Sequence, residues 1–219
     1  YSFTGLTVGT YYVAEEMQVG WTQTFPANGN YTIDIASGTI ATEKDFGNAQ
    51  LGSIAGMKFN DVNGNGVKDV GDAGLEGWEI ILAGPVNDSM LTDVNGNYLF
   101  ESLLAGNYII SEVMQGGWMQ TYPSSPSTHN IALAPAENLT GKNFGNFELG
   151  TIAGMKFEDI NQNGAKDIGE SGLTNWKIMI SGAMADTVFT DANGDYLFEG
   201  LVAGNYTVSE EVQNNWIQT

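Results

Sequence analysis

The chain has 219 residues and a formal net charge of −19, from 26 acidic and 7 basic residues. A surface of this sign repels nucleic acid and anionic lipid, which excludes a nucleic-acid-binding protein, and no apolar run approaches the roughly 18 residues that a membrane span needs. The absence of cysteine excludes disulfides, thiolate zinc sites and cysteine nucleophiles, and a single histidine leaves little for histidine catalysis.

The chain repeats itself with a period of about 98 residues. Ile54–Phe59 returns as Ile152–Phe157 and Thr92–Phe100 as Thr190–Phe198, each 98 residues later, while residues 1–24 match 98–121 at an offset of 97. We therefore interpret residues 1–50 as the C-terminal part of one repeat, 51–148 as a complete repeat, and 149–219 as the N-terminal part of the next. The sequence is expected to be a window on a longer array.

Taken in chain order, the complete repeat predicts strands throughout, because no segment has a sustained helical period. Residues 52–59 form the first strand and 60–74 an Asn-, Gly- and Asp-rich loop; Asn95-Gly96 predicts a hairpin between the strands at 91–94 and 98–100. The other predicted strands are 78–82, 108–113, 118–122, 130–133 and 139–147. This pattern predicts an antiparallel, Ig-like β-sandwich, with Trp78, Phe100, Tyr108 and Ile110 among its buried residues.

The loop after the first strand carries the most specific chemistry. Residues 159–170 fit the calcium-loop pattern Asp-x-Asn-x-Asn-Gly-x5-Glu at every position, and residues 61–72 fit it with Asp at the end. Alternate residues of such a loop, with the carbonyl of the seventh, supply the oxygens that a hard cation takes. The predicted Ca²⁺ ligands are Asp61, Asn63, Asn65, Val67, Asp69 and Asp72, then Asp159, Asn161, Asn163, Ala165, Asp167 and Glu170. The alternative is an Asn- and Asp-rich turn that is satisfied by its own hydrogen bonds.

Both loops lead into strands, where a helical EF-hand or a dockerin would continue into an amphipathic helix. The run Gly56-x-Lys58-Phe59-x-Asp61-x-Asn63-x-Asn65-Gly66, followed by Thr92-Asp93-x-Asn95-Gly96-x-Tyr98 and Gly106-x-Tyr108, resembles the SdrD-type B repeat. The resemblance covers essentially the whole chain. It implies an all-β fold of tandem Ig-like, CnaB- or prealbumin-like sandwiches with EF-hand-like calcium loops, as found in bacterial surface adhesins and their stalks.

We accordingly expect an extracellular, calcium-rigidified segment of a stalk or filament and not an enzyme. Its expected partners are neighbouring repeats of the same chain and, in a filament, copies of itself, with no nucleic acid and no insertion into a membrane. The alternative function is a glycan- or protein-binding adhesive module displayed on the cell surface. Asp93 and Asp191, beside the Asn-Gly turns, fit hairpin chemistry, and a second cation site with Asp88 or Asp186 is the alternative.

A covalent cross-link is a further expectation that the resemblance implies. CnaB-type relatives join a first-strand lysine to a last-strand asparagine beside a central glutamate, although SdrD-type B repeats manage without this bond. The corresponding residues here are Lys58, Glu112 and Asn143, of which the first two recur as Lys156 and Glu210, whereas Asp45 replaces the asparagine in the opening fragment. The alternative is that Phe59 faces the core and Lys58 is solvated, because neighbours on a strand point to opposite sides.

Overall fold

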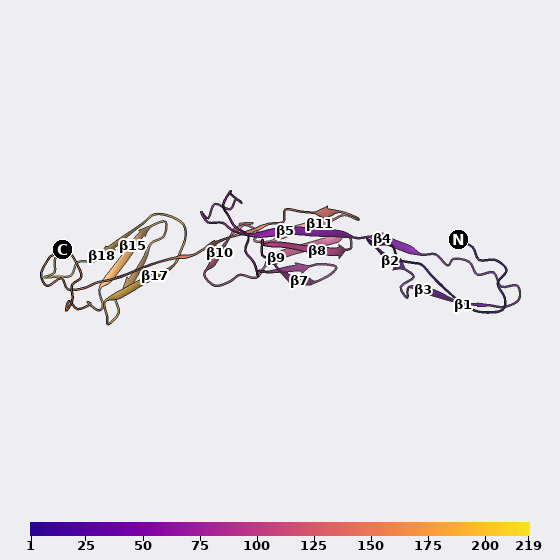
Figure 1. Cartoon of the computed structure of the whole chain (residues 1–219), viewed down its shortest axis with the longest axis horizontal. Coiled ribbons are helices and arrows are strands. Elements are labelled where there is room, and N and C mark those ends of the chain that lie inside the picture. The colour runs from indigo at the N-terminus through magenta and orange to yellow at the C-terminus, as the bar shows by residue number, and fades with distance from the viewer. The chain divides into compact units, whose positions relative to one another are not determined.

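The computed structural model describes all 219 residues and contains only strands, turns and irregular segments, which confirms the predicted all-β class (Figure 1). The strands are β1 Gly9–Ala14, β2 Trp21–Phe25, β3 Asn30–Ile35, β4 Gly47–Gln50, β5 Gly52–Asn60, β6 Glu79–Ala83, β7 Asp88–Leu91, β8 Asn97–Leu103, β9 Gly106–Glu112, β10 Trp118–Tyr122, β11 His129–Leu133, β12 Asn138–Leu139, β13 Phe144–Glu148, β14 Gly150–Met155, β15 Lys177–Gly182, β16 Asp186–Phe189, β17 Asp195–Leu201 and β18 Tyr206–Glu210. No helix in the chain is long and apolar enough to cross a membrane.

Two compact units divide the chain. One contains Tyr1–Met57, Glu76–Glu112 and Thr128–Lys142, and the other contains Lys58–Leu75, Val113–Ser127 and Asn143–Thr219. Strand β5 belongs to both: its first residues pair with β8 and β12, and its last residues pair with β13. The assignment of 1–50, 51–148 and 149–219 to successive repeats stays a prediction.

In the first unit, two sheets enclose a core. One is the antiparallel sheet β11-β9-β6-β7, and the other consists of β8 and β12 on the first part of β5. Buried and exposed side chains alternate along β6 and β8, as expected of strands with one face on a core. Trp78, Phe100, Tyr108 and Ile110 are all buried, which confirms the predicted core residues.

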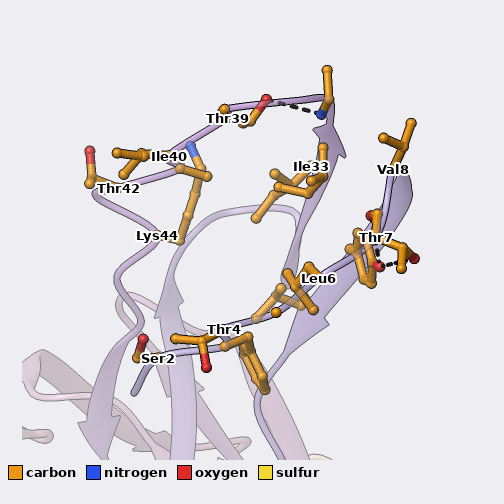
Figure 2. Close-up of a pocket in the computed structure, with 18 of the residues that line it drawn as sticks. Ser2, Thr4, Leu6, Thr7, Val8, Ile33, Thr39, Ile40, Thr42 and Lys44 are labelled. Atoms are coloured by element: carbon orange, nitrogen blue, oxygen red, sulfur yellow. Dashed lines mark hydrogen bonds between the residues drawn. The ribbon is translucent and has the colours of Figure 1, made fainter.

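The opening segment, residues 1–50, adds two separate antiparallel pairs, β1 with β3 and β2 with β4. Figure 2 shows an open hollow here, lined by Leu6, Ile33 and Ile40 among others. Phe3 is 63% exposed, although its counterpart in the complete repeat, Phe100, is only 2% exposed.

In the second unit, residues 150–210 form a sandwich of the pair β14-β17 and the sheet β16-β15-β18. Its core consists of Trp176, Ile178, Ile180, Phe198 and Leu201. The strand registers copy those of the complete repeat, because Ile152 pairs with Phe198 as Ile54 does with Phe100. The repeat in the sequence is therefore a repeat in strand pairing.

The predicted hairpin at Asn95-Gly96 is wrong. The turn forms, with Asp93 N–H donating to the carbonyl of Asn97 over 3.0 Å, but the strands on either side of it join different sheets: β7 pairs with β6, and β8 pairs with β5. The Asn-Gly turn reverses the chain locally. The strand with which each flanking strand pairs depends instead on the side chains that it buries.

Two predictions about the first and last strands also change. The predicted strand 139–147 is two strands, β12 and β13, separated by residues 140–143. The alternative that Lys58 is solvated is also wrong, because Lys58 is 0% exposed, whereas Phe59, at 1% exposed, faces the core as that alternative expected. Phe59 forms an isolated bridge with Gly74, and its ring fills the space over Gly145. Both faces of β5 are therefore covered at this point.

Candidate metal centre

The two predicted calcium loops are closed at their base by the same backbone contacts. In the first, Phe59 bridges Gly74 and Leu75 N–H donates to the carbonyl of Lys58 over 3.0 Å. In the second, Phe157 bridges Gly172, and Leu173 N–H donates to the carbonyl of Lys156 over 2.9 Å. Each loop thus leaves the first strand of its repeat and returns beside it, which holds its two ends together.

The first and last carboxylates of the loop accept backbone hydrogen bonds across it. Asp61 accepts from Asn65 N–H over 3.1 Å and from Gly66 N–H over 2.6 Å. Asp72 accepts from Val62 N–H over 3.2 Å and from Asp69 N–H over 2.8 Å. Gly66 has a φ of +76°, a left-handed conformation that glycine adopts without strain. The glycine at the sixth position therefore permits the bend that brings its N–H to Asp61.

The second loop repeats these contacts with a longer final side chain. Asp159 accepts from Asn163 N–H over 3.1 Å and from Gly164 N–H over 2.8 Å. Glu170 accepts from Ile160 N–H and from Asp167 N–H, both over 2.9 Å. Glutamate and aspartate thus reach the same two donors, so the change at the twelfth position preserves the loop.

The asparagines of each loop converge on the carboxylate at the ninth position. Asn63 and Asn65 donate to the same oxygen of Asp69 over 2.9 and 2.7 Å, and these hydrogen bonds lower the pKa of the Asp69 carboxyl. Asn161 and Asn163 donate to Asp167 over 2.7 and 2.8 Å. Each loop thus brings its predicted side-chain ligands into one hydrogen-bonded cluster.

The donor set of each loop consists of oxygen atoms, as Ca²⁺ requires, and part of it is buried. Asp61 is 0% exposed, and Asp72 and Glu170 are each 8% exposed. In this arrangement no three acidic side chains gather as ligands around one point, and amide hydrogens of the asparagines contact the ninth-position carboxylate. Val67 and Ala165 would bind the cation only through their backbone carbonyls. The proposed site therefore does not depend on which side chain stands at this position.

The structure places the cross-link candidates on three different elements. Lys58 is fully buried in β5, Glu112 ends β9, and Asn143 lies half-buried just before β13. A different asparagine, Asn146, is fully buried. Because β13 pairs with β5 in the register Phe144 to Lys58 and Asn146 to Asn60, the side chains of Lys58 and Asn146 share one face of the sheet.

Sequence reasoning missed Asn146, although a signal was present. Phe46-Gly-Asn48 returns as Phe144-Gly-Asn146, whereas the residue equivalent to Asn143 is Asp45. Asn48 donates to a carboxylate oxygen of Glu15, the counterpart of Glu112, over 2.8 Å. In residues 149–219 the ammonium of Lys156 lies 2.7 Å from a carboxylate oxygen of Glu210. The glutamate of this position thus contacts the asparagine in one repeat and the lysine in another.

Comparison with known proteins identifies the repeat. The model of the SdrD B-like domain matches residues 49–143 and 150–219. The chain belongs to the SdrD B-like domain family. Serine-aspartate repeat-containing protein F of Staphylococcus epidermidis is 27% identical over the whole chain, and serine-aspartate repeat-containing protein D of Staphylococcus aureus (strain Newman) is 29% identical. The chain spans only 15% and 19% of the length of these two relatives.

Among solved structures, a streptococcal ancillary pilin matches 98% of this SdrD B-like chain and 70% of its own, with 16% identity and a TM-score of 0.43. The Bacillus anthracis TIE protein matches 98% of this chain and 38% of its own, with 18% identity and a TM-score of 0.39.

Family membership confirms several expectations from the sequence. The family is one of structural domains in surface adhesins, which places the chain outside the cell, at the cell surface, and confirms that it is not an enzyme. The resemblance to SdrD-type B repeats is likewise confirmed over both matched segments. The chain is thus a tandem array of SdrD B-like domains from a surface protein.

Proposed function

We propose that this chain is a segment of an extracellular stalk that calcium makes rigid. The observation that carries the proposal is the identical hydrogen-bond pattern of two oxygen-rich loops that lie one repeat apart. Ordinary turn chemistry satisfies each loop locally, but it does not require the full twelve-position pattern twice in register.

The residues that would hold the cation are the six predicted ligands of each loop, with Asp69 and Asp167 at the position that often acts through water. A bound divalent cation would supply positive charge to the carboxylates of each loop. The only cations that the loops themselves supply near the last carboxylates are Lys68 and Lys166, whose ammonium groups donate to the backbone carbonyls of Asp72 and Glu170, each over 2.6 Å. Binding to the folded state alone stabilises that state by mass action.

The experiment compares thermal unfolding of the whole chain with calcium and with a chelator. Since extracellular modules commonly bind in the range of about 0.1–1 mM, millimolar calcium is expected to raise the melting temperature and slow proteolysis at residues 61–72 and 159–170. The double variant Asp61→Asn, Asp159→Asn is expected to lose this response. Glu101→Gln is the control, because it removes an acidic charge outside the loops. Identical melting curves of the wild type in both solutions would refute the proposal.

The cross-link expected from the sequence remains a proposal, and burial favours one asparagine for it. Lys58 and Asn146 are both fully buried on one face of paired strands, whereas Asn143 is only half-buried. In the step proposed, the neutral Lys58 amine attacks Cγ of the asparagine, a carbon–nitrogen bond forms, and Nδ2 leaves as ammonia. The glutamate of the repeat carries the protons.

Intact mass tests the cross-link, because each bond removes one ammonia from the calculated mass. Fragmentation of the digested protein then shows whether Lys58 is joined to Asn146 or to Asn143. The expected result is a loss of one ammonia that Asn146→Ala abolishes and Asn143→Ala does not. A wild-type mass equal to the calculated mass would exclude the bond, and the calcium proposal would be unaffected.

A further inference from the structure

The chain contains six Asn-Gly pairs, which fall into two groups. Three lie in the loops of the calcium pattern and begin at Asn63, Asn65 and Asn163. Three lie in exposed turns between strands and begin at Asn28, Asn95 and Asn193. A glycine after asparagine favours deamidation, because without a Cβ atom it does not obstruct the attack of its own nitrogen on the preceding side chain. All six pairs share this intrinsic reactivity, so a difference between them must come from their surroundings.

In the first loop, both ends of each asparagine amide are hydrogen-bonded. Asn65 Oδ1 accepts from Val67 N–H over 2.7 Å, and Asn65 Nδ2 donates to the Asp69 carboxylate over 2.7 Å. Asn63 Oδ1 accepts from Asn65 N–H over 3.0 Å, and Asn63 Nδ2 donates to the same carboxylate over 2.9 Å. Asp69 therefore holds the amide nitrogens of both asparagines.

The second loop holds its Asn-Gly pair in the same way. Asn163 Oδ1 accepts from Ala165 N–H and Asn163 Nδ2 donates to the Asp167 carboxylate, each over 2.8 Å. Rotation of such a side chain toward the next peptide nitrogen would break both bonds, one of which has a charged acceptor. A single hydrogen bond to a charged group changes an equilibrium by about tenfold or more. The loop asparagines are thus held away from the geometry that deamidation requires.

In the turns, the asparagine side chain is exposed and makes no hydrogen bond. Asn95 is bonded to Asp93 only through its backbone N–H, over 2.9 Å. Gly96 N–H donates to the carbonyl of Asp93 over 2.8 Å. In the loop, Gly66 N–H is likewise bonded, to the carboxylate of Asp61 over 2.6 Å, so the bonding of the glycine does not separate the two groups. The difference between them lies in the asparagine side chain.

We propose that the three turn asparagines are sites of spontaneous deamidation, and that Asp69 and Asp167 protect the loop asparagines from the same reaction. At Asn95, the nitrogen of Gly96 attacks Cγ, a nitrogen–carbon bond forms, and Nδ2 leaves as ammonia with the proton that Gly96 gives up. Water then opens the five-membered imide at one of its two carbonyls, which gives aspartate or isoaspartate. Each event replaces an amide with a carboxylate and makes the chain more negative by one charge. No cation takes part in this reaction.

The position of the reaction matters because isoaspartate lengthens the main chain by one carbon atom. In a loop, this would displace every later residue of the twelve-position spacing on which the oxygen cluster depends. In a turn, it changes the connection between two strands and leaves the loop intact. Asp69 and Asp167 therefore preserve the loops chemically, besides standing at the ninth position of the calcium pattern.

Peptide mapping by mass spectrometry after incubation of the full chain tests this proposal. The chain is held at mildly alkaline pH, well below its melting temperature and with a chelator, so that the hydrogen bonds of the folded loops act without a cation. Peptides with the turn asparagines are expected to deamidate about tenfold or more faster than peptides with the loop asparagines. In denaturant, all six pairs are expected to react at similar rates. Similar rates in the folded chain would overturn the proposal.

Two matched variants test the protective carboxylates. Asp69→Ala removes the acceptor that Asn63 and Asn65 share, and is expected to speed deamidation in the first loop by about tenfold or more while the second loop stays slow. Asp167→Ala is expected to do the reverse. The rate at Asn95 is expected to be the same in both variants and in the wild type. Loop rates that do not change, or an equal rise at Asn95, would overturn the protective role.

A charge measurement on the intact chain tests the turn site itself. Asn95→Gln is expected to remove one early acidic species on ion-exchange chromatography, because glutamine would have to close a larger ring. Asn65→Gln is the control and is expected to leave the early species unchanged. If Asn95→Gln removes none of them, Asn95 is not a site of deamidation. The calcium proposal stands or falls separately, since no cation is present in these experiments.

Discussion

At the scale of single residues, the complete repeat is organised around close approaches that only certain side chains allow. Phe59 is buried because Gly145, its partner on β13, leaves room for its ring: a Cβ atom on Gly145 would lie 2.5 Å from Phe59 Cζ. This close contact also lets β13 run beside the base of the calcium loop. The absence of a side chain at Gly145 thus allows the loop and the last strand to pack together.

Gly145→Ala is expected to destabilise the protein by about 1–3 kcal/mol, because the added methyl group displaces a buried ring. Denaturant unfolding measures the change. Gly116→Ala is the control, since a Cβ atom there meets nothing within 4 Å, and its effect is expected to stay within about 0.5 kcal/mol. Equal effects of the two substitutions would contradict the packing argument.

At the scale of elements, the Asn-Gly turns connect sheets and are held by one aspartate each. Asp93 accepts hydrogen bonds from the backbone N–H groups of Asn97 and Asn95 over 2.7 and 2.9 Å, and Asp191 accepts the equivalent pair from Asp195 and Asn193. These contacts account for the recurrence of Asp before Asn-Gly through turn chemistry. They do not need the second cation site considered as the alternative.

The hydrogen bonds to Asp93, that from Asn97 above all, lower the pKa of its carboxyl in the folded state. A lowered pKa contributes stability that is fully present above the unfolded value of about 3.9 and is lost as the pH falls through the folded value. Asp93→Ala is therefore expected to melt below the wild type at pH 7, and the gap is expected to narrow as the pH falls below about 4. Melting curves across this range test the prediction, and a gap that widens in acid would refute it. Glu101→Gln serves as the control for a general loss of negative charge.

At the scale of the whole molecule, the dominant property is its charge. A net charge of −19 keeps an extracellular array soluble, but it opposes every compact arrangement of acidic loops. The acidic residues of the two loops that we propose to bind calcium contribute to this charge. The excess of acidic residues that gives the molecule its negative charge therefore also underlies its proposed dependence on a cation.

Sodium chloride is accordingly expected to raise the melting temperature of the chelated protein as its concentration increases from about 0.01 to 0.5 M, because screening shortens the range of repulsion from about 30 Å to under 10 Å. With saturating calcium the same change in salt is expected to have a smaller effect. Thermal scans of both states provide the measurement. A chelated protein whose melting temperature falls with added salt would show that repulsion does not limit its stability.

The sequence by itself determined the features that depend on neighbours along the chain. Alternating residues and glycine-rich turns identified the strands at 52–59, 78–82 and 118–122 closely, and the twelve-residue spacing identified both loops. Buried aromatic positions such as Trp78 and Tyr108 also followed from the local pattern. These features are set by the local backbone and by the two-residue period of side chains on a strand, both of which can be read from a short segment.

Only the tertiary structure decided which strands pair and what covers each face. It separated β7 from β8 into different sheets and buried Lys58 and Phe59 on opposite faces of β5. It also buried Asn146 fully and left Asn143 half-buried. Each of these outcomes depends on residues far apart in the chain, and no local propensity records whether a distant strand, such as β13 beside β5, will arrive to cover a side chain.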